Sequence, residues 1–323
     1  AHHAWAEAWV EGLGWLGFDV ANVICPTDHY VRLAAALDAR YAAPIRGSRR
    51  GGAGESLEVA VKVAQDSASN DRNDREPSHM TYAVALRLNR GIVFAADTRT
   101  NAGVDNVSQY RKLHFWRRIG DRVLVIMTAG NLAVTQSVLS ILNEQICAED
   151  ARDTTNLMTA TSMYRAARVV GDALREVRSV DGPALEASKA GFSASLILGG
   201  QIGSEGPRLF QIYPEGNFIE ASDDTPYFQI GEHKYGKPII DRVARPDMRL
   251  GEAAKLLLLS FDSTVRSNLS VGMPIDLLMY QRDMLDVRLV RRIHENDEYF
   301  RRLSSSWSDA LRAAVAQMEE FKG

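Results

Sequence analysis

The sequence predicts an α+β fold built on a large sheet, and three observations support this. Two short apolar runs, 82–88 and 92–96, flank the segment Asn89-Arg90-Gly91, which is the pattern of a β-hairpin with a glycine in its loop. Both runs are apolar almost without interruption, as in strands that are buried on both faces. Beyond the hairpin, the apolar periodicity changes from strands to two helices, then back to strands and again to helices, which is an α+β order.

The other predicted elements follow in chain order. Continuous apolar runs at 113–116 and 122–129 predict two more core strands. Apolar residues at helical spacing predict a helix over 134–146 and a second over 163–177, which is expected to stop at the Asp-Gly-Pro word of 181–183. The remaining predicted elements are strands at 192–198, 208–213, 217–221 and 227–230, and helices at 235–243, at 251–267 and from Trp307 to Met318.

The composition allows a substantial core and indicates no charged partner. The chain has 323 residues, 46% of them hydrophobic, and a formal net charge of -3. This balance gives no electrostatic reason to expect nucleic acid or a membrane surface as a partner. The longest strongly apolar run, 256–259, is too short to span a bilayer. Only Cys25 and Cys147 occur, without metal-ligand spacing, so we expect no metal, no cofactor and a reducing, cytoplasmic setting.

Polar residues with useful chemistry stand at the ends of the predicted core strands. Thr81 precedes the first strand, Asp97 and Arg99 follow the second, and Lys112 precedes the run at 113–116. A hydroxyl, a carboxylate and an ammonium group are therefore each placed at a strand end. Taken singly, such residues are usually part of inert turns and surface ion pairs. Their joint order and spacing favour a catalytic site.

The sequence around these residues resembles the proteasome β-type subunits and, more closely, the bacterial proteasome-related family called Anbu, the ancestral β subunit. The words that carry the resemblance are MTY at 80–82, DTRTNAGVD at 97–105, RK at 111–112, TAGNL at 128–132 and SNLSVG at 267–272. They run in order across most of residues 81–323. The resemblance implies a four-layer αββα sandwich of the N-terminal nucleophile hydrolase type for residues 81–323.

The resemblance also implies a threonine-dependent hydrolysis of amide bonds. Thr81 would attack a carbonyl with its side-chain oxygen, and its own α-amino group, which titrates near ~8 in model peptides, would accept the proton. Lys112 would lower the pKa of the attacking system, and Asp97 would hold its ammonium group in place. The backbone N–H of Gly130 would bind the oxyanion. Ser270 matches a distal serine that helps to position the terminal amine.

Two positions depart from the proteasome pattern. Proteasome subunits carry a Gly-Ser-Gly word where this chain has Gly231-Glu232-His233. They carry an Asp three residues before the distal serine, where this chain has Ser267. The network around the terminal amine is therefore expected to differ, and Arg99, Glu232 and Ser267 are candidate supporting residues.

The nitrogen of Thr81 is joined to Met80 in this sequence, so it has no basic lone pair. The simplest expectation is that translation in the cell starts at Met80, that the methionine is then removed, and that the first 79 residues are an artefact of the gene model. With residues 1–80 attached, the enzyme is expected to be latent.

Two alternatives to a peptidase remain open from the sequence. One keeps the nucleophile and gives it a small amide as substrate, and the other is a catalytically silent, self-assembling scaffold. The family resemblance implies a homo-oligomer, either a ring or an open spiral, and a peptide or protein substrate.

Residues 1–63 show a separate resemblance. The words HAW at 3–5 and GFD at 17–19 are similar to the carboxy-terminal end of a bacterial transglutaminase-like cysteine protease domain. That likeness implies a partial, β-rich segment in which His3 is the imidazole base and Asp19 its orienting carboxylate. In that family the cysteine nucleophile precedes the His and the Asp, whereas Cys25 follows them. The nucleophile would therefore lie before residue 1, and we expect an inactive remnant. Residues 64–79 contain no large apolar side chain, and residues 64–80 are expected to be a flexible linker.

Overall fold

The computed structural model describes residues 6–10, 14–18, 81–101, 107–188 and 191–321, and the chain divides into two units, Ala1–Asp71 and Arg72–Gly323. The described part of the first unit is an antiparallel hairpin of β1 (Ala6–Val10) and β2 (Gly14–Phe18), in which Trp9 pairs with Trp15. His3 and Asp19 lie outside the described residues, as does the linker up to Met80. The transglutaminase-like interpretation of this segment therefore stays a prediction.

The second unit contains two five-stranded antiparallel sheets. Its strands are β3 Tyr82–Leu88, β4 Gly91–Asp97, β7 Leu113–Arg118, β8 Arg122–Gly130, β9 Ala194–Ile202, β10 Arg208–Ile212, β11 Phe218–Glu220, β12 Tyr227–Gly231, β13 Ile275–Gln281 and β14 Leu289–Ile293. One sheet has the order β11-β10-β9-β8-β7 and the other has the order β12-β3-β4-β13-β14. A short ribbon pairs β5 (Arg99–Asn101) with β6 (Val107–Gln109).

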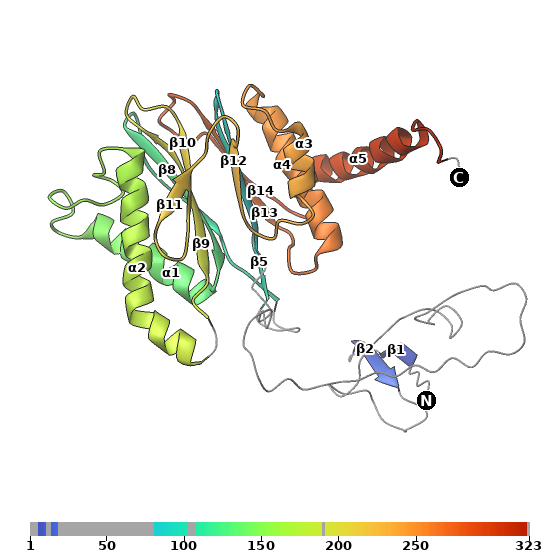
Figure 1. The fold of residues 1–323 in the computed structure, drawn as a ribbon, viewed down its shortest axis with the longest axis horizontal. Coiled ribbons are helices and arrows are strands. Elements are labelled where there is room, and N and C mark those ends of the chain that lie inside the picture. Colours follow the sequence, from blue (N-terminus) through green and yellow to red (C-terminus); the bar gives the residue numbers. More distant parts are fainter. Residues whose placement is uncertain (1–5, 11–13, 19–80, 102–106, 189–190, 322–323) are drawn as a thin grey trace, which may run out of the picture. The chain divides into compact units, whose positions relative to one another are not determined.

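Helices cover the outer faces of both sheets. Helices α1 (Leu132–Cys147) and α2 (Met163–Ala187) lie on the sheet that contains β8. Helices α3 (Lys237–Val243) and α4 (Leu250–Ser267) lie on the sheet that contains β3, and Figure 1 shows the two helix pairs on opposite sides of the two sheets. The predicted four-layer αββα sandwich is confirmed.

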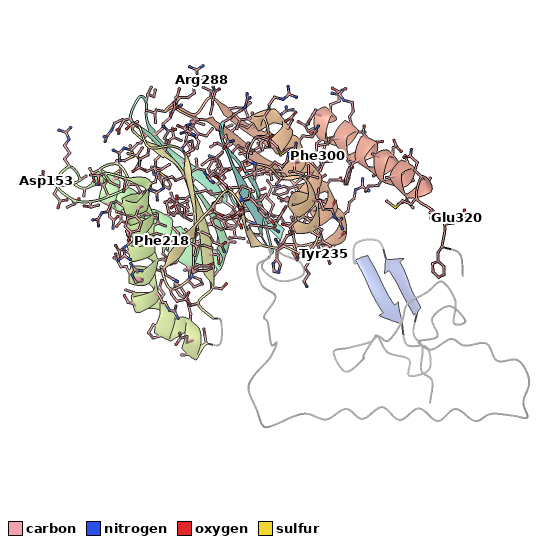
Figure 2. The ribbon with its side chains drawn as sticks, turned by 45° about the horizontal axis from the view of Figure 1, so that its top comes forward. Asp153, Phe218, Tyr235, Arg288, Phe300 and Glu320 are labelled. Carbon is pink, nitrogen blue, oxygen red and sulfur yellow. The ribbon has the colours of Figure 1, made fainter. Side chains whose placement is uncertain are left out.

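Three buried clusters fill the spaces between the four layers. Alternate residues of β3 belong to different clusters: Val84 and Leu86 pack under α4, whereas Ala83 and Ala85 pack between the sheets. Because β3 is covered on both faces, its sequence is apolar almost throughout, which explains the continuous run. In the other sheet, Phe218 of β11, labelled in Figure 2, packs its ring against the cluster under α1 and α2.

The two sheets approach closely at one glycine. A Cβ atom at Gly199 of β9 would lie 2.7 Å from the ring of Phe94, which projects from β4 and is fully buried. The aromatic ring therefore fills the space that a side chain on β9 would occupy. Close packing of this kind fixes the distance between the sheets.

The structure corrects two helix predictions. Helix α2 does not stop at 181–183 but continues through Pro183 to Ala187, because a proline removes only one backbone donor and Leu185 still packs against the core. Helix α5 (Glu298–Ala316) begins nine residues before Trp307, where the Asp297 side chain accepts a hydrogen bond from the Phe300 amide at 2.9 Å.

The sequence patterns also missed the two strands β13 and β14 of the sheet that contains β3, as well as the short β5 and β6. Asp276 in β13 and Arg292 in β14 are cross-strand neighbours, and their side chains make a two-pronged ion pair at 2.7 and 2.8 Å. The charges interrupt the apolar pattern, yet each is neutralised by its partner in the neighbouring strand. The pairing that makes them acceptable is visible only in the folded sheet.

Helix α5 contacts the body of this unit through its first two turns and then extends outward. Phe300, labelled at its start in Figure 2, is buried, Leu303 packs against the cluster under α4, and Ser304 accepts a hydrogen bond from Arg266 of α4 at 2.6 Å. Leu311, Val315 and Met318 follow one another at helical spacing and are 46%, 68% and 68% exposed. Within the described residues, no helix combines the length and apolar character needed to cross a bilayer.

The contact between the sheets gives a first testable prediction. Phe94→Ala should lower the free energy of unfolding by about 3–5 kcal/mol, because it removes a fully buried ring and leaves a cavity opposite Gly199. Urea denaturation followed by circular dichroism measures this loss. As a control, Ile119→Ala removes a side chain that is 71% exposed and should change stability by less than about 0.5 kcal/mol. Equal effects of the two substitutions would contradict the packing argument.

Candidate functional site

The candidate residues meet at one edge of the sheet that contains β3. Thr81 directly precedes β3, Asp97 is the last residue of β4, and Gly231 is the last residue of β12. In the registers of these strands, Gly231 pairs with Tyr82, and Asp97 pairs with Ile275 at the start of β13. Four neighbouring strands therefore begin or end at the same edge. Thr81 lies among these strand ends and is 3% exposed.

A buried ion pair lies at this edge. The Nζ atom of Lys112 donates to Oδ1 of Asp97 at 2.7 Å and to the carbonyl oxygen of Arg99 at 2.5 Å. The carboxylate of Asp97 also accepts the amide N–H groups of Tyr82, at 3.1 Å, and Gly272, at 3.4 Å. The Asp97 side chain is 0% exposed and that of Lys112 is 6% exposed, so solvent screens the pair little.

Burial disfavours the charge on both partners. It lowers the pKa of the Lys112 ammonium below its usual range, and the attraction of Asp97 opposes this change. Burial likewise raises the pKa of the Asp97 carboxyl, which the ammonium and the two amide donors oppose. A lysine with a lowered pKa can exchange protons near neutral pH more readily than an exposed lysine can.

Two backbone contacts place Thr81 beside this pair. The amide of the next residue, Tyr82, is bound to Asp97, and the carbonyl oxygen of Thr81 accepts the N–H of Glu232 at 2.6 Å. A Cβ atom at Gly231 would lie 1.9 Å from the Thr81 carbonyl oxygen and 3.2 Å from the Thr81 Cβ, and the φ angle of Gly231 is +81°. Only glycine allows this approach.

Gly130 is connected to the same region through β8. The carbonyl oxygen of Lys112 accepts the N–H of Thr128 at 3.0 Å, and Gly130 follows two residues later, about 7 Å farther along the strand. Gly130 has a φ angle of +108°, and a Cβ there would lie 2.4 Å from the carbonyl oxygen of Ser193. The next residue, Asn131, caps α1 by accepting the N–H of Ala133 at 2.9 Å. This end of β8 therefore adjoins the positive end of a helix dipole.

The supporting candidates lie around the turn between α4 and β13. Arg99 donates from Nη1 to the carbonyl oxygen of Leu269 at 2.8 Å. Ser270 is half-buried, and its backbone N–H donates to Oδ1 of Asn268 at 2.9 Å. Ser267 is the exposed last residue of α4, and within the described residues no side-chain hydrogen bond joins it to Thr81 or Asp97.

Glu232 is joined to a residue that the sequence interpretation did not single out. Its Oε2 atom accepts a hydrogen bond from Nδ2 of Asn268 at 2.6 Å, and the two residues are 4% and 9% exposed. Asn268 stands inside the SNLSVG word, between Ser267 and Ser270, so its place in that word could have marked it as a candidate site residue. Its partner is 36 residues earlier, and only the fold brings the two together. In the described part of the chain, no group of three or more His, Cys, Asp or Glu side chains could hold a metal ion.

Comparisons with known proteins match this unit. A family model described as proteasome subunit matches residues 78–278. Among solved structures, the chain is similar to Anbu from a Hyphomicrobium species, at 66% identity with a TM-score of 0.70 over 75% of this chain and 100% of that chain. It is similar to Anbu (ancestral beta-subunit) from Yersinia bercovieri, at 49% identity with a TM-score of 0.70 over 75% of this chain and 99% of that chain.

Two further relatives are more distant in sequence. The helical assembly of the Anbu complex from Pseudomonas aeruginosa is 44% identical, with a TM-score of 0.71 over 75% of this chain and 98% of that chain. The proteasome subunit beta of Haloquadratum walsbyi is 24% identical over 227 residues, which are 69% of this chain and 82% of that protein.

The buried ion pair gives the second prediction. Lys112→Met should destabilise the chain by about 3–5 kcal/mol at pH 8, because it leaves the Asp97 carboxylate buried without its counter-ion. The pKa of Asp97 then rises further above its unfolded value. The loss should therefore shrink as the pH falls and the carboxyl binds a proton. Urea denaturation at pH 8 and pH 5 measures both effects.

A matched double variant tests the cause of this loss. Lys112→Met combined with Asp97→Asn removes the unpaired charge and keeps a side-chain oxygen for the Tyr82 amide. It should be more stable at pH 8 than Lys112→Met alone. A double variant that is no more stable than the single one would show that the charge of Asp97 is not the cause.

The third prediction concerns the close approach at Gly231. Gly231→Ala places a methyl group against the carbonyl oxygen of Thr81 and strains a residue of positive φ, so β12 and Thr81 must move apart. The strain alone costs about 1–2 kcal/mol. The amide resonance of Glu232, whose N–H binds the Thr81 carbonyl, should shift in a ¹⁵N-¹H spectrum. Gly251→Ala is the control, because a Cβ at Gly251 meets no atom within 4 Å. A similar shift of this resonance in the control would count against the argument.

Proposed function

The chain belongs to the proteasome subunit family, and on that premise we propose that it is a threonine peptidase that cleaves amide bonds with Thr81. The observation that carries this proposal is the buried Lys112–Asp97 pair, because Asp97 is hydrogen bonded to the amide next to Thr81. A buried ion pair costs desolvation energy and is weak evidence for stability. The pair lies beside Thr81, where its charges can act on the threonine, so a catalytic role explains it better than a stabilising one does.

The proposed reaction uses groups of this chain alone. The Thr81 hydroxyl attacks the substrate carbonyl and passes its proton to the free Thr81 amine, while the Lys112 ammonium favours the developing negative charge. The N–H of Gly130 binds the oxyanion of the tetrahedral intermediate. The intermediate expels the amine product, which takes the proton, and leaves an ester on Thr81. Water, activated by the same amine, then hydrolyses the ester and restores the hydroxyl.

The reaction requires that the Thr81 nitrogen be free. In this sequence Met80 is bonded to it, so the proposed enzyme is latent until the residues before Thr81 are removed. Residues 81–323 form the proposed hydrolase domain, after a linker at 64–80 and a remnant at 1–63 that would hold His3 and Asp19. These assignments rest on the composition of the first 80 residues and on the two sequence resemblances.

We also propose that the chain assembles with copies of itself into a ring or an open spiral and acts on peptides or proteins in the cytoplasm. The similarity to the helical assembly from Pseudomonas aeruginosa supports self-assembly. The exposed apolar stripe of α5 is consistent with it. The cytoplasmic setting rests on the low cysteine content of the sequence.

One observation favours a second candidate, the catalytically silent scaffold. Thr81 is 3% exposed and bonded to Met80, so the chain as written presents no free nucleophile to a substrate. A scaffold would need only the surfaces that join copies. A small-amide hydrolase would share the chemistry of the peptidase and differ in its substrate.

The fourth prediction tests the proposed function. The mass and amino-terminal sequence of the protein made from its native gene should show a product that begins at Thr81. That product should react with a threonine-directed β-lactone at position 81 and should hydrolyse fluorogenic peptides. Thr81→Ala should abolish both reactions and leave the size of the assembly unchanged by light scattering.

The outcomes separate the candidates. Peptide turnover that persists in Thr81→Ala would refute the proposed nucleophile. Turnover of small amides without turnover of peptides would favour the small-amide hydrolase. A product that still carries residues before Thr81, and an assembly that the β-lactone does not label, would favour the scaffold.

A further inference from the structure

Two loops flank Thr81 and come from distant parts of the chain. One is the segment 231–234 that follows β12, and the other is the turn 268–272 between α4 and β13. The buried hydrogen bond between Glu232 and Asn268 joins them. Glu232 stands at one position where the sequence departs from the proteasome pattern, and Asn268 directly follows the other, Ser267.

Every polar group of Glu232 has a partner. Its backbone N–H donates to the Thr81 carbonyl at 2.6 Å, and its own carbonyl oxygen accepts from Nε2 of Gln229 at 2.7 Å. The Oε1 atom accepts the amides of His233, at 2.8 Å, and Lys234, at 2.7 Å. A carboxylate that is 4% exposed is stable only with such donors.

The direction of the Glu232–Asn268 bond is determined by the neighbours of each residue. The Oε1 atom of Glu232 is committed to two backbone amides, so Oε2 faces Asn268. The Oδ1 atom of Asn268 accepts the N–H of Ser270 at 2.9 Å, so Nδ2 faces Glu232. Because the carboxylate only accepts, a reversed Asn268 amide would place Oδ1 against Oε2 and Nδ2 against the Ser270 N–H, which sets acceptor against acceptor and donor against donor.

We propose that Glu232 and Asn268 are a pair of positioning residues that hold Thr81 and the Ser270 turn in register with each other. The chain of bonds runs from the Thr81 carbonyl through Glu232 and Asn268 to the Ser270 amide. Neither residue takes part in bond breaking. This inference rests on the proposed function for its catalytic consequence, whereas its structural part stands independently of catalysis.

An exchange of the two side-chain types tests the pair. Glu232→Gln keeps an oxygen for the amides of His233 and Lys234, but it turns an NH₂ group toward the NH₂ group of Asn268. Asn268→Asp keeps an oxygen for the Ser270 amide, but it places a second carboxylate against Glu232. The double variant reverses the direction of the bond, so that the new amide donates to the new carboxylate, and it keeps oxygens for the amides of His233, Lys234 and Ser270.

Hydrogen exchange of the full-length chain is the first measurement. Protection of the Ser270 amide should fall about 10- to 100-fold in each single variant, because a hydrogen bond that involves a charged group is lost or opposed. The double variant should return to within about 3-fold of the parent protein. Glu220→Gln, the same change in the exposed ion pair with Arg208, should leave the Ser270 amide unaffected.

The Asn268→Asp single variant should also show a distinctive dependence on pH. Two carboxylates at hydrogen-bond distance cannot both be ionised, so one of them holds a proton with a raised pKa. The protonated pair forms the bond. The protection factor of Ser270 should therefore be close to that of the parent at low pH and should be lost as the pH rises through the raised pKa. Glu232→Gln should show no such pH dependence.

Turnover gives the catalytic readout. Turnover is compared in proteins that begin at Thr81: if the parent hydrolyses amides in a way that depends on Thr81, each single variant should lower kcat at least 10-fold with little change in KM, and the double variant should restore it. Singles that leave the protection of Ser270 unchanged, or a double variant as unprotected as the singles, would overturn the proposal. The proposal would also be overturned if the Val125 amide, in the core between the sheets, lost as much protection as the Ser270 amide, since that would indicate general destabilisation. A parent that begins at Thr81 and shows no turnover would overturn the proposed function, and hydrogen exchange would still decide the role of the pair.

Discussion

The burial of one ion pair is the constraint on which the rest of the site depends. Lys112 and Asp97 lose the solvation of their charges at the edge where β3, β4, β12 and β13 meet, and this loss must be offset by nearby donors and acceptors. The fold supplies them as backbone groups: the amides of Tyr82 and Gly272 and the carbonyl of Arg99. Thr81 is held beside the pair because its neighbour Tyr82 is one of those donors.

This arrangement is possible because glycines allow neighbouring segments of the chain to approach closely. Gly231, Gly130 and Gly272 stand where a Cβ would meet the Thr81 carbonyl, the Ser193 carbonyl and the guanidinium of Arg99. A side chain at Gly231 or Gly130 would push apart two backbone segments, and one at Gly272 would displace the Arg99 side chain. The compactness of the site therefore comes from missing side chains as much as from the polar residues themselves.

Sequence patterns predicted the strands well where they are covered on both faces and poorly where charges are paired between strands. The continuous apolar runs of β3, β4 and β8 indicated their burial, since nearly every position along them is buried. Strands β13 and β14 carry Asp276 and Arg292, whose mutual neutralisation requires a register that periodicity does not contain. Helix α2 passes Pro183 because a packed apolar side chain beyond it outweighs one missing backbone bond.

The sequence by itself determined the order of strands and helices, the identity of the polar groups at the strand ends and the glycines around them, because these follow from local periodicity and from words a few residues long. The four layers were expected from the family resemblance and not from periodicity. Only the tertiary structure decided which of those groups meet. It joined Asp97 to the amide of Tyr82, 15 residues away, and to the amide of Gly272, 175 residues away. It also joined Glu232 to Asn268, 36 residues away. Such contacts depend on strand register and on the α4–β13 turn, and neither leaves a pattern in a short stretch of chain.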